Sequence, residues 1–124
     1  MSLAEYFENT KGLGVLATAD GGGNVDAALY ARPHVVDEEN IAFIMSDRLS
    51  HNNVSANPKC VYLFVEEGEG YKGKRLYLTM TGEETDKEKI ESLRRKKFDY
   101  KDPSATKYLV SFHIDNVRPL VGDA

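Results

Sequence analysis

Short strand-type segments separated by turns follow one another along most of this chain. Each segment is five to ten residues long and is either continuously apolar or alternates apolar and polar residues, which are the patterns of buried and half-buried strands. The six segments cover residues 15–19, 25–34, 41–45, 60–65, 75–81 and 108–115. Hairpin-length connections favour an antiparallel sheet, and a sheet of short strands avoids exposed edges by closing. We therefore expect a six-stranded antiparallel β-barrel, with a helix-decorated sandwich as the alternative.

The first two segments are predicted to form a hairpin. Residues 20–24 contain three glycines and an asparagine, residue types that tolerate the positive φ angles of tight turns. The return segment, residues 25–34, alternates, so its apolar residues lie on one face and Arg32 and His34 on the other. Pro33 cannot donate a hydrogen bond to a neighbouring strand, so we expect a bulge or a sheet edge there.

Two helices are indicated outside the central part of the chain. Ser2 and Glu5 have the spacing of a capping box at the N-terminus. Thr85 and Glu88 repeat that spacing before a second helix, whose apolar residues continue at helical intervals to Phe98.

Length and composition indicate one soluble domain over residues 1–124. The hydrophobic fraction of 41% suffices for one compact core, and a small domain gains stability from a partner subunit. The net charge of −4 argues against nucleic acid or an anionic membrane as a partner. Cys60 is the one cysteine, which fits a reducing compartment. The sequence has no signal-peptide pattern and no apolar run of membrane-spanning length, so we expect a cytoplasmic protein.

The segment from Met45 to Val54 is the most informative for function. It leaves a buried strand and enters a predicted short helix, residues 50–57, with Ser50 as its N-cap. Free backbone N–H groups and the helix dipole make such a start an anion site. Arg48 can add a two-pronged contact to a phosphate, and Ser46 or Ser50 can add a hydroxyl. An ordinary N-cap with the other polar groups solvated explains the same residues.

Two further basic residues are candidates for the same site. Arg32 and His34 share one face of the return segment, where they could close over a phosphate or a polarised ring carbonyl. An exposed, solvated barrel exterior is the commoner explanation of such residues.

Other chemistries find little support in the sequence. Cys60 has no nearby base and begins an apolar strand, so it is interpreted as a core thiol. His34, His51 and His113 lack metal-ligand spacing, and we predict no metal site. The chain shows no dinucleotide or phosphate-loop fingerprint and no nucleophile elbow.

Several pieces of the sequence, taken in order, carry a resemblance to a known family. The most distinctive is Asn57-Pro58, which follows the predicted polar helix and precedes an apolar strand. The others are residues 14–18, the strand with Arg32, and residues 43–46, 50–57, 61–64 and 75–83. Over roughly residues 13–84 the chain resembles the pyridoxamine 5′-phosphate oxidase-like FMN-binding split barrels.

The resemblance implies a six-stranded antiparallel split barrel and a homodimer with FMN at its interface. It implies that the backbone of Ile44 and Met45 lies along the flavin ring. It also implies a phosphate site formed by Arg32, Ser46, Arg48 and Ser50, together with His51. Many members carry a lysine where this chain has Ser50, so either Arg48 supplies that charge or the phosphate is bound more weakly.

The resemblance also sets the functional expectation. The chain lacks the C-terminal extension that carries substrate-binding residues in true pyridoxamine phosphate oxidases, so that activity is not predicted. We expect an FMN-dependent oxidoreductase acting on a small substrate that the sequence does not identify. One alternative is a flavin carrier or electron-transfer module without its own substrate. The other is a split barrel that is flavin-free or binds haem and acts as a sensor or a structural dimer.

Overall fold

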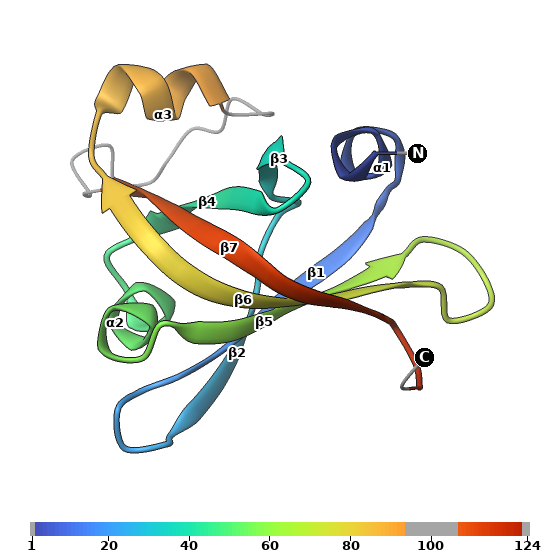
Figure 1. Ribbon diagram of the computed structural model, residues 1–124, viewed down its shortest axis with the longest axis horizontal. Helices are drawn as coiled ribbons and strands as arrows, with labels where there is room; N and C mark the ends of the chain where they lie inside the picture. The colour runs from blue at the N-terminus through green and yellow to red at the C-terminus, as the bar shows by residue number, and fades with distance from the viewer. Residues whose placement is uncertain (1, 94–106, 123–124) are drawn as a thin grey trace.

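The computed structural model describes residues 2–93 and 107–122, and within them seven strands and three helices (Figure 1). In chain order these are α1 Leu3–Asn9, β1 Gly12–Ala19, β2 Val25–Leu29, β3 His34–Asp37, β4 Asn40–Ser46, α2 Leu49–Ala56, β5 Lys59–Glu66, β6 Gly73–Glu84, α3 Lys87–Leu93 and β7 Lys107–Pro119.

The strands form one antiparallel sheet in the order β2-β1-β5-β6-β7-β4-β3. Although β2 and β3 follow each other in the chain, they lie at opposite ends of this order, so residues 30–33 carry the chain from one end to the other. The sheet therefore curls around a common core. The expected antiparallel split barrel is confirmed.

The number of strands differs from the expectation. The return segment is divided into β2 and β3 rather than forming one strand with a bulge, which gives seven strands instead of six. The division falls at Arg32 and Pro33, where proline lacks the N–H that a continuous ladder needs. The last backbone bond on the β2 side runs from Tyr30 N to Gly14 O, at 3.0 Å.

The barrel interior is filled by alternate residues of the strands, with an aromatic cluster at its centre. The rings of Phe43 and Tyr62 lie 4.9 Å apart between centroids, and those of Phe7 and Phe64 lie 5.3 Å apart. Phe7 comes from α1 and is fully buried, so this helix closes one end of the barrel. Burial of each such side chain contributes about 1.5–3 kcal/mol to folding.

Tyr62 also fixes the crossing segment. Its hydroxyl reaches the carbonyl oxygens of Tyr30, at 3.2 Å, and Ala31, at 3.1 Å. Gly14 lies beside this hydroxyl, and a Cβ there would come within 2.5 Å of the Tyr30 carbonyl oxygen. The glycine is therefore required by close approach of the crossing segment to β1.

The start of α1 agrees with the prediction. Ser2 Oγ accepts a hydrogen bond from Glu5 N at 3.1 Å, and Ser2 N donates to Glu5 Oε1 at 3.3 Å, which completes the capping box.

The predicted N-cap of the last helix is wrong by one residue. α3 begins after Asp86, whose carboxylate accepts from Glu88 N at 3.0 Å and takes the place expected for the Thr85 hydroxyl. Phe98 lies outside the described residues. No helix in the described ranges has the length and apolar character to cross a membrane.

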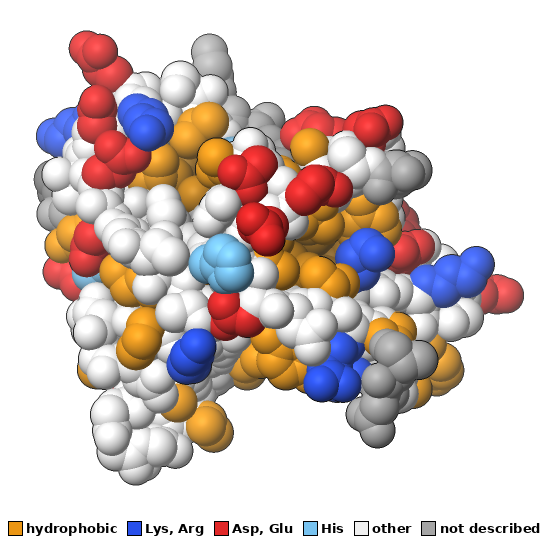
Figure 2. All heavy atoms as spheres, viewed as in Figure 1, with side chains coloured by type: hydrophobic (Ala, Val, Ile, Leu, Met, Phe, Trp, Pro, Cys, Tyr) orange, Lys and Arg blue, Asp and Glu red, His pale blue; other side chains and the backbone are white. Residues whose placement is uncertain are grey.

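The surface seen in Figure 2 carries most of its acidic side chains along one edge, over α3, the β3–β4 turn and α1. The chain as a whole has a net charge of −4. A bound phosphate would be repelled by such an edge, so cationic groups elsewhere decide where an anion can bind.

Candidate functional site

The candidate site is the start of α2, where the chain turns sharply out of β4. Arg48 N donates to Ser46 O at 2.8 Å, which folds the connection back on itself. Arg48, not Ser50, is the N-cap, and its side chain makes no capping hydrogen bond. The N–H groups of the first turn of an α-helix have no partner within the helix. This start therefore presents donors and the positive end of the helix dipole, as an anion site requires.

Ser50 is buried in the first turn rather than capping it. Its side chain is 5% exposed and hydrogen-bonds with Tyr30, on the crossing segment. Burial raises the pKa of the Tyr30 hydroxyl, and the hydrogen bond with Ser50 offsets part of that effect. The N-cap prediction for Ser50 is wrong because α2 begins one residue earlier, at Leu49, and Ser50 is buried within its first turn.

The start of β7 contacts the β4–α2 connection with two successive residues, one from each face of the strand. Lys107 Nζ donates to Ser46 Oγ at 2.7 Å, and the register of β4 and β7 pairs Ser46 with Lys107. The Tyr108 ring stacks on the His51 imidazole, with centroids 3.9 Å apart and an interplanar angle of 11°. The sequence reasoning missed both residues, because nothing local connects positions about 60 apart. Only the register of the strands does so.

His51 is held between two carboxylates. Its Nε2 lies 2.9 Å from Glu83 Oε2, and its Nδ1 lies 3.6 Å from Asp47 Oδ1. The imidazole is buried, and among the described residues Nδ1 has no hydrogen-bond partner. Glu83 also lines an open hollow of about 350 Å³ at the β6–β7 irregularity, together with Thr81, Gly82, Glu84 and Ser111. His51 thus links α2 to this hollow.

β4 offers an open edge next to the site. β7 pairs with β4 from Asn40 to Ser46, whereas the pairing of β3 with β4 reaches only as far as His34 opposite Ala42. In the described part of the chain, no strand pairs with the far edge of β4 at Ile44 or Met45. Backbone groups on that edge can hydrogen-bond a ligand. The structure thus brings His34, Ile44 and Met45 to one edge.

Arg32 lies elsewhere. Its guanidinium donates to the carbonyl oxygens of Phe7, at 2.6 Å, and Thr10, at 3.2 Å, at the C-terminal end of α1. Figure 1 shows α1 and α2 well separated. Within one copy of the chain, Arg32 is therefore not brought to the start of α2, and it satisfies carbonyl groups that a helix end leaves without partners.

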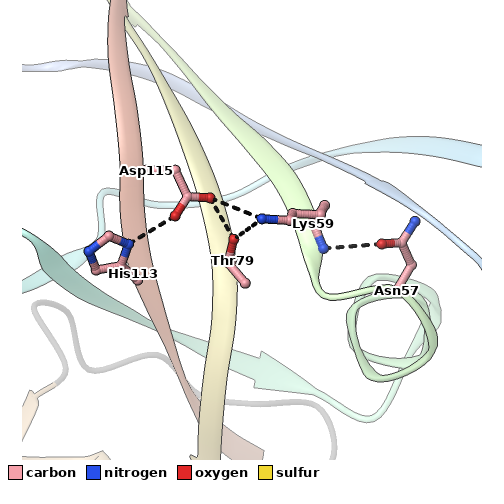
Figure 3. A network of polar contacts seen from close by, with 5 residues as sticks. All are labelled: Asn57, Lys59, Thr79, His113 and Asp115. Carbon is pink, nitrogen blue, oxygen red and sulfur yellow. Dashed lines mark hydrogen bonds and ion pairs between the residues drawn. The ribbon is translucent and has the colours of Figure 1, made fainter.

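A second polar cluster lies on the outer surface of β5, β6 and β7 (Figure 3). Asp115 Oδ2 accepts from Thr79 Oγ1 at 2.5 Å and lies 3.5 Å from Lys59 Nζ, while Asp115 Oδ1 lies 2.9 Å from His113 Nδ1. The hydrogen bond from Thr79, with that of His113, lowers the pKa of Asp115. The side chains of Lys59 and His113 are 70% and 44% exposed, so we interpret the cluster as a solvated cross-strand network.

Burial keeps the Cys60 thiol protonated, as expected for a core cysteine. Desolvation raises its pKa to about 12, so at pH 8 only about one thiol in ten thousand is ionised. We expect a thiol reagent such as Ellman's to label the native protein at least about a hundredfold more slowly than the urea-unfolded protein. Equal rates at matched pH would contradict this burial. Among the described residues, no group of three His, Cys, Asp or Glu side chains could hold a metal ion.

Comparison with known proteins supports the fold. The chain is similar to an FMN-binding protein from Syntrophomonas wolfei subsp. wolfei, with a TM-score of 0.76 and 17% identity over 98% of this chain and 85% of that chain. An F420 reductase matches with a TM-score of 0.72 and 14% identity over 95% of this chain and 98% of that chain. A Lactobacillus delbrueckii protein proposed to be a pyridoxamine 5′-phosphate oxidase matches with a TM-score of 0.67 and 19% identity over 93% of this chain and 88% of that chain.

No family model matches the sequence, and a search of curated proteins gave no match. The structural likenesses have identities of 14–19%, and at that level they establish the fold alone. The chain has the split-barrel fold of the pyridoxamine 5′-phosphate oxidase-like, FMN-binding proteins, as the sequence resemblance implied.

Proposed function

We propose that this protein binds FMN with the phosphate at the start of α2, and that it is a flavin-dependent oxidoreductase. The observation that carries the proposal is the start of α2, which has no side-chain cap, has Arg48 as its N-cap residue and follows Ser46 through a tight turn. The likeness in fold to an FMN-binding protein supports a flavin as the ligand.

The residues at this place fit a phosphate monoester. Backbone N–H groups, hydroxyl groups and guanidinium groups are common hydrogen-bond donors to phosphate oxygens in proteins. The buried Nδ1 of His51 has no hydrogen-bond partner in the described part of the chain, which leaves one polar atom of the site unsatisfied. The negative charges of Asp47 and Glu83 would repel a phosphate. Both carboxylates, however, contact the imidazole of His51 and are turned toward it.

The open edge of β4 fits the flavin ring. A flavin has ring carbonyl and N–H groups that can pair with backbone N–H and C=O groups, as a neighbouring strand would. Ile44 and Met45 lie on this edge, and His34 lies where the β3 ladder ends. We propose that these residues orient the ring, while the α2 start holds the phosphate.

We further propose that the functional unit is a homodimer. The outer apolar face of β1, β2 and β5 consists of Leu13, Val15, Ala17, Val25, Ala27, Leu29, Val61, Leu63 and Val65. Leu13, Val25 and Leu29 are 56%, 82% and 69% exposed. A contiguous exposed apolar patch of this kind marks an interaction surface. None of these positions is charged, so no like charges from these residues would face each other when two copies meet here.

Bound FMN would supply hydride or electron transfer, and the protein would supply binding and electrostatics. The hollow beside Glu83 is open and lined by polar groups, unlike an enclosed substrate pocket. For that reason a flavin carrier without its own substrate is the second candidate. Rapid reduction of the bound flavin by NADH or NADPH, followed by turnover with an acceptor, would favour the enzyme. Slow reduction independent of any substrate would favour the carrier.

The first test is an absorbance spectrum of the purified protein before and after FMN is added and the excess removed. We expect flavin bands to stay with the protein. The Arg48→Ala variant should bind FMN about 10- to 100-fold more weakly, because a charge-assisted hydrogen bond contributes about 1.5–3 kcal/mol.

The Lys72→Ala variant, which removes a lysine from the exposed β5–β6 loop, should bind FMN as the parent does. A parent protein that releases all added FMN would overturn the proposed function. Equal FMN affinity of the parent and the Arg48→Ala variant would overturn the proposed phosphate site.

A further inference from the structure

The outer apolar face borders an aromatic side chain on β6. Leu76 and Leu78 are buried in the core, so Tyr77 between them points to the outer face of the sheet. The register places Tyr77 opposite Val61 of β5, which belongs to the outer apolar face, and opposite Asn116 of β7. Residues that lie opposite each other on neighbouring strands share one face of the sheet. The outer apolar face therefore continues onto β6.

Two arginines hold the Tyr77 ring in place. The Arg118 guanidinium lies over the ring, 5.4 Å from its centroid, and Arg75 Nη1 donates to the Tyr77 hydroxyl at 3.4 Å. Arg75 is itself fixed, because its Nε donates to the carbonyl oxygen of Pro119 at 2.8 Å. A side chain that is already ordered loses little conformational entropy when a partner covers it. Tyrosine and arginine are also among the residue types that contribute most to binding at interfaces.

The next residue outward-facing on β6 belongs to the polar network. Thr79 lies two residues beyond Tyr77, and its hydroxyl accepts from Lys59 Nζ at 2.7 Å and donates to Asp115 (Figure 3). The network thus borders the apolar and aromatic part of the same face. Apolar residues at the centre, aromatic and arginine side chains beside them and a solvated polar border are the arrangement of a protein–protein interface with its core and rim.

The size of a stable interface decides how far it must extend on this face. Such an interface takes about 20–30 residues from each partner, more than the outer apolar face contains. β2 is the end strand of the sheet, so on this face the interface can widen only across β6 and β7. We propose that the second copy of the chain covers β6 as well as the outer apolar face, and that Tyr77 is an anchor of this interface. The inference rests on the proposed homodimer.

The test measures the dimer dissociation constant of the full-length protein by light scattering or analytical ultracentrifugation. We expect Tyr77→Ala to raise it about 100- to 1,000-fold, because an anchor residue changes affinity by roughly 30-fold and occurs in both copies. The Tyr77→Phe variant keeps the ring beneath Arg118 and should retain most of the affinity. Tyr71→Ala is the matched control. It removes the same side chain from the β5–β6 loop, where Tyr71 is 84% exposed, and should dimerise as the parent does.

Hydroxyl-radical labelling of the unmodified protein tests the same point without a substitution. Tyr77 should be protected where the protein is dimeric and should react after dilution to the monomer, whereas Tyr71 should react equally in both. If Tyr77→Ala dimerises as tightly as the parent, or if Tyr77 is labelled equally in dimer and monomer, the role of Tyr77 is refuted and the homodimer stands. If the parent is monomeric at micromolar concentration with FMN present, the proposed homodimer and the inference fall together. Thermal unfolding of each variant identifies any loss of affinity that comes from misfolding.

Discussion

Replacing Leu29 by aspartate should convert the protein to a monomer at micromolar concentration and remove its ability to retain flavin. Leu29 is 69% exposed and lies on the end strand of the sheet, within the outer apolar face and opposite Val15, which in turn pairs with Leu63. Burial of one leucine side chain contributes about 1.5–3 kcal/mol. In a two-fold symmetric interface each residue occurs twice, so the loss is about 3–6 kcal/mol, or roughly 10²–10⁴-fold in the dissociation constant.

Light scattering or analytical ultracentrifugation would measure this effect. Val36→Asp is the matched control, because Val36 is 70% exposed and lies on β3, outside the apolar face. We expect the control to remain dimeric and both variants to keep the circular dichroism of the parent. A parent that is monomeric with FMN present, or a Leu29→Asp variant that dimerises as tightly as the parent, would refute the proposed interface.

The second large effect is expected from Gly14→Ala, which should lower the free energy of unfolding by about 3 kcal/mol. The new Cβ would lie 2.5 Å from both the Tyr30 carbonyl oxygen and the Tyr62 ring carbon Cζ. The Tyr30 carbonyl belongs to the backbone and cannot rotate away. Relief of the overlap therefore requires movement of the crossing segment and weakens the hydrogen bonds from the Tyr62 hydroxyl to Tyr30 and Ala31.

Urea unfolding of the parent and the variant gives this difference directly. Gly21→Ala is the matched control, since a Cβ at that position would meet no atom within 4 Å. We expect the control to change stability by no more than about 0.5 kcal/mol. A Gly14→Ala variant as stable as its control would show that the crossing segment is not held against β1.

Local patterns predicted much of the fold because they act over a few residues. The capping box of Ser2 and Glu5 involves residues three apart, and it is present as predicted. The cap of α3 is also a local feature, but Asp86 and Thr85 are adjacent candidates and the sequence alone does not separate them. Pro33 marked an irregularity correctly. That the chain there passes from one end of the sheet to the other depends on the pairing of distant strands.

The candidate site is likewise predictable from the sequence only where its residues are close together in the chain. The sequence indicated residues 46–51 from their chemistry, and the structure places this segment at a helix start with open donors. It did not indicate Glu83, Lys107 or Tyr108, because they reach the site through strand register. Arg32 was predicted to belong to the site, but it does not reach it. Its guanidinium instead donates to carbonyl groups at the end of α1, 22 to 25 residues earlier in the chain.

Local sequence patterns are enough to predict a small antiparallel β protein with a polar, cationic segment after the buried strand Ile41–Met45. Those properties follow from alternation, turn chemistry and capping, which are set by neighbouring residues. Three features depend on the tertiary structure: the apolar row of β2 faces outward, Arg32 donates to carbonyl groups at the end of α1, and Lys107 lies opposite Ser46. Each depends on which strands pair and in which register, and that choice comes from packing of the whole core rather than from any local segment.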